Sequence, residues 1–281
     1  MKMTAEEFCR WDAKSITLVG MSGVGKTYLS SRLREAHWFH YSADYRIGTR
    51  YLSEPILDNI KQQAMQVPFL RDLLRSDSIY ISNNITVDNL TAVLTFLGKL
   101  GAPLCGGLPL AEFKRRQKLY RDAEVAAMLD VPDFIRKARE IYGYRHFIND
   151  SAGSLCELDD PHVLDVLAEH TLILYIEATE QNGRELLRRA EADPKPLYYR
   201  PEFLDAELAR FLAEQRLAGS EDIEPDEFVL WMFPRLFHAR IPRYEAIARR
   251  YGYTIRADVL APVRTEAEFV ACVQDVLAAA S

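Results

Sequence analysis

Residues 15–27 read SITLVGMSGVGKT and carry the strongest structural signal in the chain. Its first part, 15–19, is a short apolar and β-rich run, which predicts a buried parallel strand. A glycine-rich turn follows, and residues from Lys26 to about Ala36 have the composition of a helix. This succession places several backbone N–H groups and a helix N-terminus at one point, where they attract an anion.

The turn matches the phosphate-binding loop pattern G-x-x-x-x-G-K-[ST]. We expect Lys26 to reach the β- and γ-phosphates of a nucleotide and to act in catalysis. The Thr27 hydroxyl is expected to ligate Mg²⁺. The nucleotide is ATP, with GTP as the alternative, since no guanine-reading N-K-x-D sequence is present. The residues predicted to bind it are Gly20, Ser22, Gly23, Val24, Gly25, Lys26, Thr27 and Tyr28.

On both sides of this loop in the sequence, strands and helices alternate, which predicts an α/β fold: a parallel sheet covered on both faces by helices. The remaining strands are expected at 38–42, 144–149, 171–176 and 252–255. Outside the insertion, we predict a first helix opened by Thr4 and Glu7, and others at 161–169, 181–192, 201–217, 225–250 (broken by Pro234 and Pro242) and 265–279. A helical insertion at 53–142, with helices near 54–66, 68–75, 87–97, 109–129 and 133–142, separates two parts of a core formed by 1–52 and 143–281.

Two acids are expected where strands end. Asp44 follows the second strand, and the carboxyl ends of parallel strands face the ligand crevice. It is therefore predicted to accept a hydroxyl proton or to bind Mg²⁺ through water. Asp150 ends an aromatic and apolar strand, as in a Walker B element, and is predicted to support Mg²⁺. For both acids the alternative is a helix N-cap.

Several other residues are candidates for the acceptor side. Arg46 and Arg50 are predicted to hold an anionic acceptor, or else to be solvated surface arginines. Gly153 would let the backbone pass close to a phosphate or acceptor. Arg188 is predicted to neutralise transferring phosphoryl charge from a mobile lid, together with its neighbours on the helix at 181–192. A solvated helix face is the alternative for these arginines.

Composition excludes several classes of protein. The 281 residues carry a net charge of −6, which argues against a protein that mainly binds nucleic acid. No apolar run approaches the roughly 18 residues of a membrane span, so a cytoplasmic location is expected. The six histidines form no metal set. The four dispersed cysteines are predicted to be buried thiols rather than disulfides or zinc ligands.

With these residues identified, the chain resembles the shikimate kinase and gluconate kinase branch of P-loop small-molecule kinases. The loop has that branch's form, G-x-x-G-x-G-K-[ST], and Asp44–Ile47 matches part of its D-x-D-x-x-I. Arg240–Ala248 resembles its R-x-P-x-Y-x-x-x-A helix, and Arg256–Pro262 stands where relatives clamp adenine. The resemblance covers about half of the chain, roughly 15–52 and 144–281. It implies a five-stranded sheet ordered 2-3-1-4-5, with ATP and Mg²⁺ as cofactors.

The sequence also departs from that branch. Ser42 replaces the first Asp of D-x-D, Gly48 replaces an acid, and Gly153 stands alone where relatives have three glycines. The insertion has no counterpart, and the whole chain is similar to bacterial proteins labelled only as ATPases. We therefore expect phosphoryl transfer from ATP to a hydroxyl of a small molecule that the sequence does not identify. The alternatives are an ATP-hydrolysing switch that acts on a protein partner through the insertion, and a kinase acting on a nucleic acid end or nucleotide-sugar.

Overall fold

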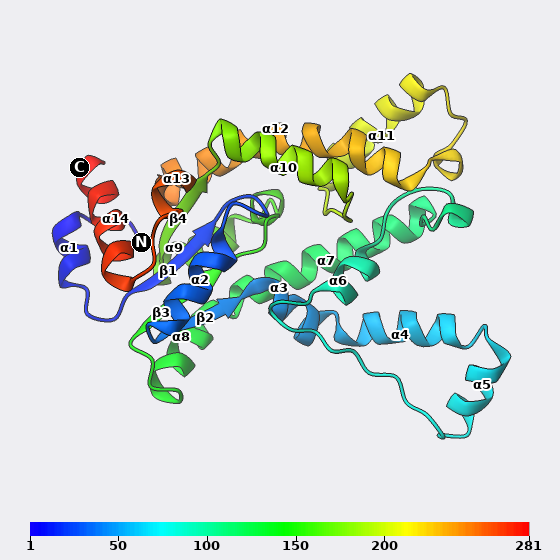
Figure 1. Ribbon diagram of the computed structural model, residues 1–281, viewed down its shortest axis with the longest axis horizontal. Helices are drawn as coiled ribbons and strands as arrows, with labels where there is room; N and C mark the ends of the chain where they lie inside the picture. Colours follow the sequence, from blue (N-terminus) through cyan, green and yellow to red (C-terminus); the bar gives the residue numbers. More distant parts are fainter. Residues whose placement is uncertain (281) are drawn as a thin grey trace.

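The computed structural model describes residues 1–280 and has a five-stranded parallel sheet at its centre (Figure 1). The strands run in the order β2-β3-β1-β4-β5, so the predicted fold class and strand order are confirmed. Their bounds are β1 Ser15–Val19, β2 Trp38–Ser42, β3 His146–Asp150, β4 Leu172–Glu177 and β5 Gly252–Arg256.

Helices cover both faces of this sheet. The α-helices are α1 Ala5–Arg10, α2 Lys26–Glu35, α3 Ala43–Arg46, α4 Ser53–Ala64, α5 Pro68–Arg75, α6 Thr91–Leu97, α7 Leu110–Leu129, α8 Val131–Glu140, α9 Pro161–His170, α10 Glu180–Ala192, α11 Pro201–Gln215, α12 Pro225–Tyr251, α13 Ala257–Leu260 and α14 Glu266–Ala279. The short turns are the π-helical η1 Ile47–Tyr51 and the 3₁₀ helices η2 Pro103–Cys105, η3 Leu155–Glu157 and η4 Ser220–Asp222. The capping box at Thr4 and Glu7 is present at α1.

Alternation along the strands explains the two apolar layers. Ile16 and Leu18 of β1 face the cluster that contains α2 and α14, while Val19 faces the cluster that contains α7, α9 and α12. All five residues of β1 are buried, as expected for a central strand of a parallel sheet covered on both faces. The carboxyl ends of β1, β2 and β3, three adjacent strands, consequently open on the same edge.

The helix α12 differs from the prediction. We expected Pro234 and Pro242 to break it, but it runs without interruption over 27 residues. Each proline removes one backbone hydrogen bond, which by itself disfavours a helix. Packing on both sides of the prolines outweighs this cost, because Met232 and Leu236 are buried in one apolar cluster and Tyr244 in another. The helix α6 also begins later than predicted, at Thr91, because residues 86–89 close a turn.

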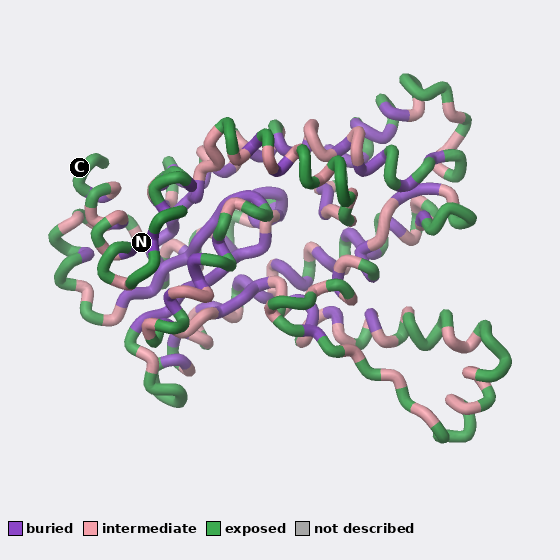
Figure 2. Tube along the Cα trace, in the orientation of Figure 1, coloured by how far each residue is buried: buried purple, intermediate pink, exposed green. Residues whose placement is uncertain are grey.

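The region 53–142 has two parts of different character. The helix α7 is buried along one stripe, with Phe113, Tyr120, Ala127 and Met128 among its buried residues. By contrast, α4 and α5 form an arm that projects from the rest of the molecule, and α5 has no buried residue (Figures 1 and 2). Residues of 197–239 also pack on this region, in a cluster that contains Leu100 and Phe113. The separate acceptor-side subdomain at 53–142 stays a prediction.

The cysteines differ from the prediction, and the helices can be compared with the length that a membrane span needs. Cys156 is buried, but Cys9 and Cys105 are exposed and Cys272 is half-buried, so the prediction of four buried thiols was wrong for three of them. None of the helices within residues 1–280 combines the length and apolar character that a membrane crossing requires.

Candidate active site

The loop between β1 and α2 has the conformation that the motif requires. Gly25 caps α2 with a φ of 104°, in the left-handed region that favours glycine. The N-terminus of α2 therefore begins directly at Lys26, with its free backbone N–H groups at the loop. A Cβ on Gly153, after β3, would lie 2.6 Å from the backbone nitrogen of Ser22. The two backbones can approach this closely only because residue 153 is glycine.

A cavity of about 260 Å³ lies on this loop. It brings together residues from three segments that are distant in sequence: the loop itself, the end of β2 and the end of β3. Its lining residues are Ser22, Gly23, Gly25, Lys26, Thr27, Tyr28, Asp44, Asp150, Ser151 and Gly153. Gly20 and Val24, also predicted to bind nucleotide, do not line it, and Val24 packs against the apolar clusters.

Lys26 is the basic residue of this cavity. Its side chain is only 5% exposed, and its Nζ donates hydrogen bonds to the carbonyl oxygens of Gly20 (2.7 Å) and Met21 (3.0 Å). Burial lowers the pKa of Lys26, while the nearby carboxylates of Asp150 and Asp44 act in the opposite direction. A cation held in a buried position beside backbone N–H groups is suited to phosphate oxygens.

Thr27 and Asp150 supply a hydroxyl and a carboxylate to the same cavity. Mg²⁺ prefers oxygen ligands and is commonly held by one or two protein groups together with waters and substrate phosphates. These two side chains therefore fit Mg²⁺. Asp150 also has a partner that the sequence did not reveal: its Oδ2 lies 3.5 Å from Nε2 of His40, a buried side chain of β2. The neighbouring strands β2 and β3 place the two side chains together.

Asp44 lies in α3, on the β2 side of the cavity. Burial is the main cause that raises the pKa of Asp44 to about 6, and the negative charge of Asp150 adds to it. Lys26 acts in the opposite direction, as does a hydrogen bond of 3.4 Å from the Tyr120 hydroxyl to Asp44 Oδ1. A carboxyl with a pKa near 6 can accept a proton at neutral pH and is matched to general-base catalysis.

The helix α7 supplies a second acid near Asp44. Glu124 lies one turn after Tyr120 and is fully buried. Its Oε2 accepts a hydrogen bond of 2.5 Å from the Ser154 hydroxyl, and its Oε1 has no hydrogen-bond partner. Burial raises the pKa of Glu124 to about 8, to which the charge of Asp44 contributes. The sequence analysis missed this residue, because nothing in its local sequence distinguishes it from the other acids of α7.

Glu124 makes the stability of the protein depend on pH. Its pKa in the folded state, about 8, lies above the ordinary 4.5, so the folded state retains a proton that the unfolded state has lost between these values. Stability should therefore fall as the pH rises from about 5 to about 8. We expect Glu124→Gln to gain on the order of 2–4 kcal/mol relative to wild type over this interval. Urea unfolding at pH 5 and pH 8.5 measures the difference.

Glu112 is a control of opposite sign for that experiment. Hydrogen bonds from Arg115 and Arg116 lower the pKa of Glu112 to about 2, so its contribution is present above the unfolded pKa and is lost as the pH falls toward 2. Glu112→Gln should therefore gain nothing between pH 5 and pH 8.5. An equal change for both variants would contradict the assignment to Glu124.

The three predicted arginines do not line the cavity. The Nε of Arg46 is 2.7 Å from Oδ2 of Asp130, which also accepts a hydrogen bond from Tyr51. Arg188 makes two hydrogen bonds of 2.9 Å with Glu185 on its own helix. Arg50 is exposed. The helix α10 nevertheless reaches the loop, since a Cβ on Gly23 would lie 2.6 Å from Leu186 Cδ2. The roles proposed for these arginines stay predictions.

The matches found between this chain and known proteins are with solved structures. No family model matches the chain, and no curated protein matches it. A shikimate kinase from Bacteroides thetaiotaomicron aligns over 94% of this chain and 98% of its own, with 15% identity and a TM-score of 0.42. A shikimate kinase from Acinetobacter baumannii, in complex with shikimate, aligns over 96% of this chain and 94% of its own, with 13% identity and a TM-score of 0.37.

Proposed function

We propose that this protein transfers the γ-phosphoryl group of ATP, in the presence of Mg²⁺, to a hydroxyl of a small molecule. The observation that carries the proposal is the cavity itself, because it joins a phosphate-binding lysine and an acid with a pKa near neutrality. Phosphoryl transfer requires positioned charges and a group that receives the hydroxyl proton, and little further covalent chemistry from the protein.

Each residue of the site has a distinct role in the proposed reaction. Lys26 and the N–H groups of the loop bind the triphosphate, and Thr27 and Asp150 hold Mg²⁺, which neutralises phosphate charge when bound. Asp44 orients the acceptor hydroxyl and takes its proton. The bond between the γ-phosphorus and the bridging oxygen breaks as the bond to the acceptor oxygen forms, which yields ADP and a phosphate ester.

The helix α7 distinguishes this proposal from a nucleotide-driven switch. A kinase should present polar groups from the insertion to the crevice, and Tyr120 and Glu124 lie beside Asp44. We propose on this basis that 53–142 is the acceptor-side subdomain and that 1–52 and 143–281 form the nucleotide-binding core. The second candidate, a switch acting on a protein partner, is favoured by the arm, where Phe69 and Tyr80 are 70% and 86% exposed.

One assay separates the two candidates. ADP formation from Mg·ATP is measured with and without a deproteinised metabolite extract, using ATP labelled in the γ-phosphate. We expect the extract to raise the rate and the label to enter a new ester. The same reaction with EDTA is the control for Mg²⁺. A slow rate that the extract does not change, with all label released as inorganic phosphate, would favour the switch and contradict the kinase.

A further inference from the structure

A buried histidine of β2 contacts the acid that the proposed function assigns to Mg²⁺. The side chains of His40 and Asp150 are 2% and 6% exposed, and Nε2 of His40 lies 3.5 Å from Oδ2 of Asp150. The parallel pairing of β2 with β3 sets Ser42 opposite Asp150, and His40 is two residues before Ser42 on β2. Because side chains two residues apart on a strand point to the same face of a sheet, the strand register itself places the His40 ring beside Asp150.

Nε2 of His40 lacks a hydrogen-bond partner elsewhere in the folded chain. This nitrogen is buried and forms no hydrogen bond with any of the described residues, whereas buried polar atoms in proteins are normally paired. Without a proton, Nε2 would set its lone pair against the carboxylate, but with a proton it can donate to Oδ2. A separation of 3.5 Å is long for a hydrogen bond, and active-site hydrogen bonds often shorten when substrate binds.

The other polar groups near Asp150 have different partners. The Nζ of Lys26 donates to two backbone carbonyl oxygens of the loop. The Ser42 hydroxyl accepts a hydrogen bond from the backbone N–H of Tyr45 and so caps α3. Over residues 1–280, His40 is the only side chain that pairs with the Asp150 carboxylate. Because this contact is made at Oδ2, the other carboxylate oxygen, Oδ1, remains for a cation.

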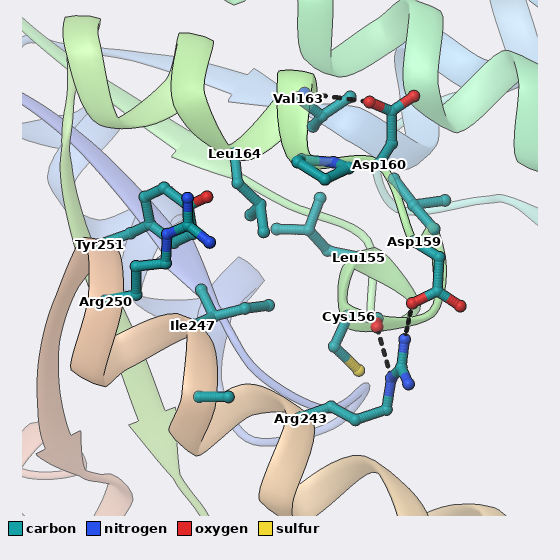
Figure 3. A pocket seen from close by; sticks show the side chains of 13 residues that line it. Leu155, Cys156, Asp159, Asp160, Val163, Leu164, Arg243, Ile247, Arg250 and Tyr251 are labelled. Atoms are coloured by element: carbon teal, nitrogen blue, oxygen red, sulfur yellow. Dashed lines mark hydrogen bonds and ion pairs between the residues drawn. The ribbon is translucent and has the colours of Figure 1, made fainter.

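The acids at the largest neighbouring cavity are already engaged. Figure 3 shows this cavity, of about 380 Å³, which is lined by residues of η3, α9 and α12. Asp159 is bonded to Arg243, and Asp160 accepts hydrogen bonds from backbone N–H groups of the first turn of α9. Within residues 1–280, no group of three or more His, Cys, Asp or Glu side chains could hold a metal ion. Mg²⁺ that binds together with nucleotide is therefore expected at Thr27 and Asp150, where phosphates and water complete its ligands.

We propose that His40 is a positioning residue for the Mg²⁺ site: its Nε2–H donates to Oδ2 of Asp150 and so directs Oδ1 toward the cation. The inference rests on the proposed function, which assigns Asp150 to Mg²⁺, and it adds a residue that does not itself touch the metal. Carboxylates that hold metals are commonly oriented by hydrogen bonds of this kind, and the loss of such a partner usually lowers metal affinity by about 10–100-fold.

The test measures how strongly Mg²⁺ assists nucleotide binding, with no acceptor present. The imido analogue of ATP, which resists hydrolysis, is titrated into the protein by calorimetry, once with EDTA and once with saturating Mg²⁺. Mg²⁺ binds the free nucleotide equally in every experiment, so the ratio of the two affinities changes between variants only with the affinity of Mg²⁺ for the protein–nucleotide complex. In His40→Leu we expect this ratio to fall about 10–100-fold. The affinity in EDTA should stay near that of wild type, which shows that the variant is folded.

Two matched variants separate the hydrogen bond from packing. Glutamine supplies an N–H donor in place of Nε2, so His40→Gln should keep a ratio close to wild type. His146 is also a buried histidine beside an acid, with its Nε2 3.3 Å from Oε1 of Glu266, but it lies at the opposite end of β3 from Asp150. His146→Leu should therefore leave the ratio unchanged. A fall in either variant equal to that in His40→Leu would assign the effect to packing and overturn the inference.

A double variant tests whether His40 acts through Asp150. Asp150→Asn alone should lower the ratio, and His40→Leu should then add little to that loss. The same additional fall with and without the Asp150 carboxylate would overturn the inference, as would an unchanged ratio in His40→Leu. A ratio that Asp150→Asn leaves unchanged would refute the Mg²⁺ role of Asp150, and the inference with it. Ester formation with the metabolite extract, measured separately, tests the kinase function itself.

Discussion

Asp44→Asn is expected to lower kcat for phosphoryl transfer by about 10²–10⁴-fold, the usual contribution of a positioned general base. The amide is nearly isosteric with the acid but cannot take the acceptor's proton. Because Asp44 is proposed to act on the acceptor, the KM for ATP should change little. Ester formation from γ-labelled ATP with the metabolite extract measures both constants. Full transferase activity in this variant would remove Asp44 from the base role.

The pH profile tests the same residue independently. The Asp44 carboxyl must be ionised to act as a base, and its pKa is raised to about 6 in the free protein. The wild-type kcat/KM for the acceptor should therefore fall as the pH decreases through 6, because the active form takes up one proton. The residual activity of Asp44→Asn should lack this decrease. A profile of unchanged shape in the variant would assign the ionisation to another group.

Lys26→Met is expected to lower kcat/KM for ATP by about 10²–10³-fold, comparable to the loss of one preorganised group that stabilises developing negative charge. Methionine preserves most of the length and apolar volume of the side chain and removes only the charge and donors. The variant should also bind ATP more weakly. Isothermal titration calorimetry with ATP and Mg²⁺ measures the affinity, and an assay of ester formation measures the rate.

Lys14 offers a matched control for that variant. It is likewise buried (8% exposed), and its Nζ donates to the carbonyl oxygen of Trp11, before β1 begins and away from the cavity. Lys14→Met should affect stability in a similar way but leave ATP affinity unchanged. Equal loss of affinity in both variants would indicate a general loss of structure. Unchanged affinity in Lys26→Met would refute the phosphate role of Lys26.

The sequence predicted the core of the fold because local and global signals agree there. The apolar run of β1, the glycines after it and the start of α2 all favour one arrangement, and the five strands are where they were expected. The continuity of α12 was not predictable, because it depends on packing partners at distant positions. Proline disfavours a helix locally, whereas Met232 and Tyr244 contact residues that no local pattern identifies.

The candidate site, like the fold, was predicted only in part. Asp150 and Gly153 meet the loop because β3 lies next to β1, and Asp44 joins them because β2 lies next to β3. Glu124 lies 80 residues after Asp44 in the sequence and reaches the site from α7, and nothing in its local sequence indicates this. Arg188 illustrates the converse, since its partner Glu185 is three residues away and the pair was visible in the sequence.

The strand order predicts how the protein behaves when a protease cleaves its chain near Tyr80. Tyr80 lies in an extended, exposed part of the arm, between the segment that contains β1 and β2 and the segment that contains β3, β4 and β5. A protease that cleaves there produces two fragments. In the sheet, β3 of the second fragment lies between β2 and β1 of the first fragment. In the same way, β1 of the first fragment lies between β3 and β4 of the second. The two pieces interlock, so they should remain together after cleavage and could be produced separately and recombined as a split protein.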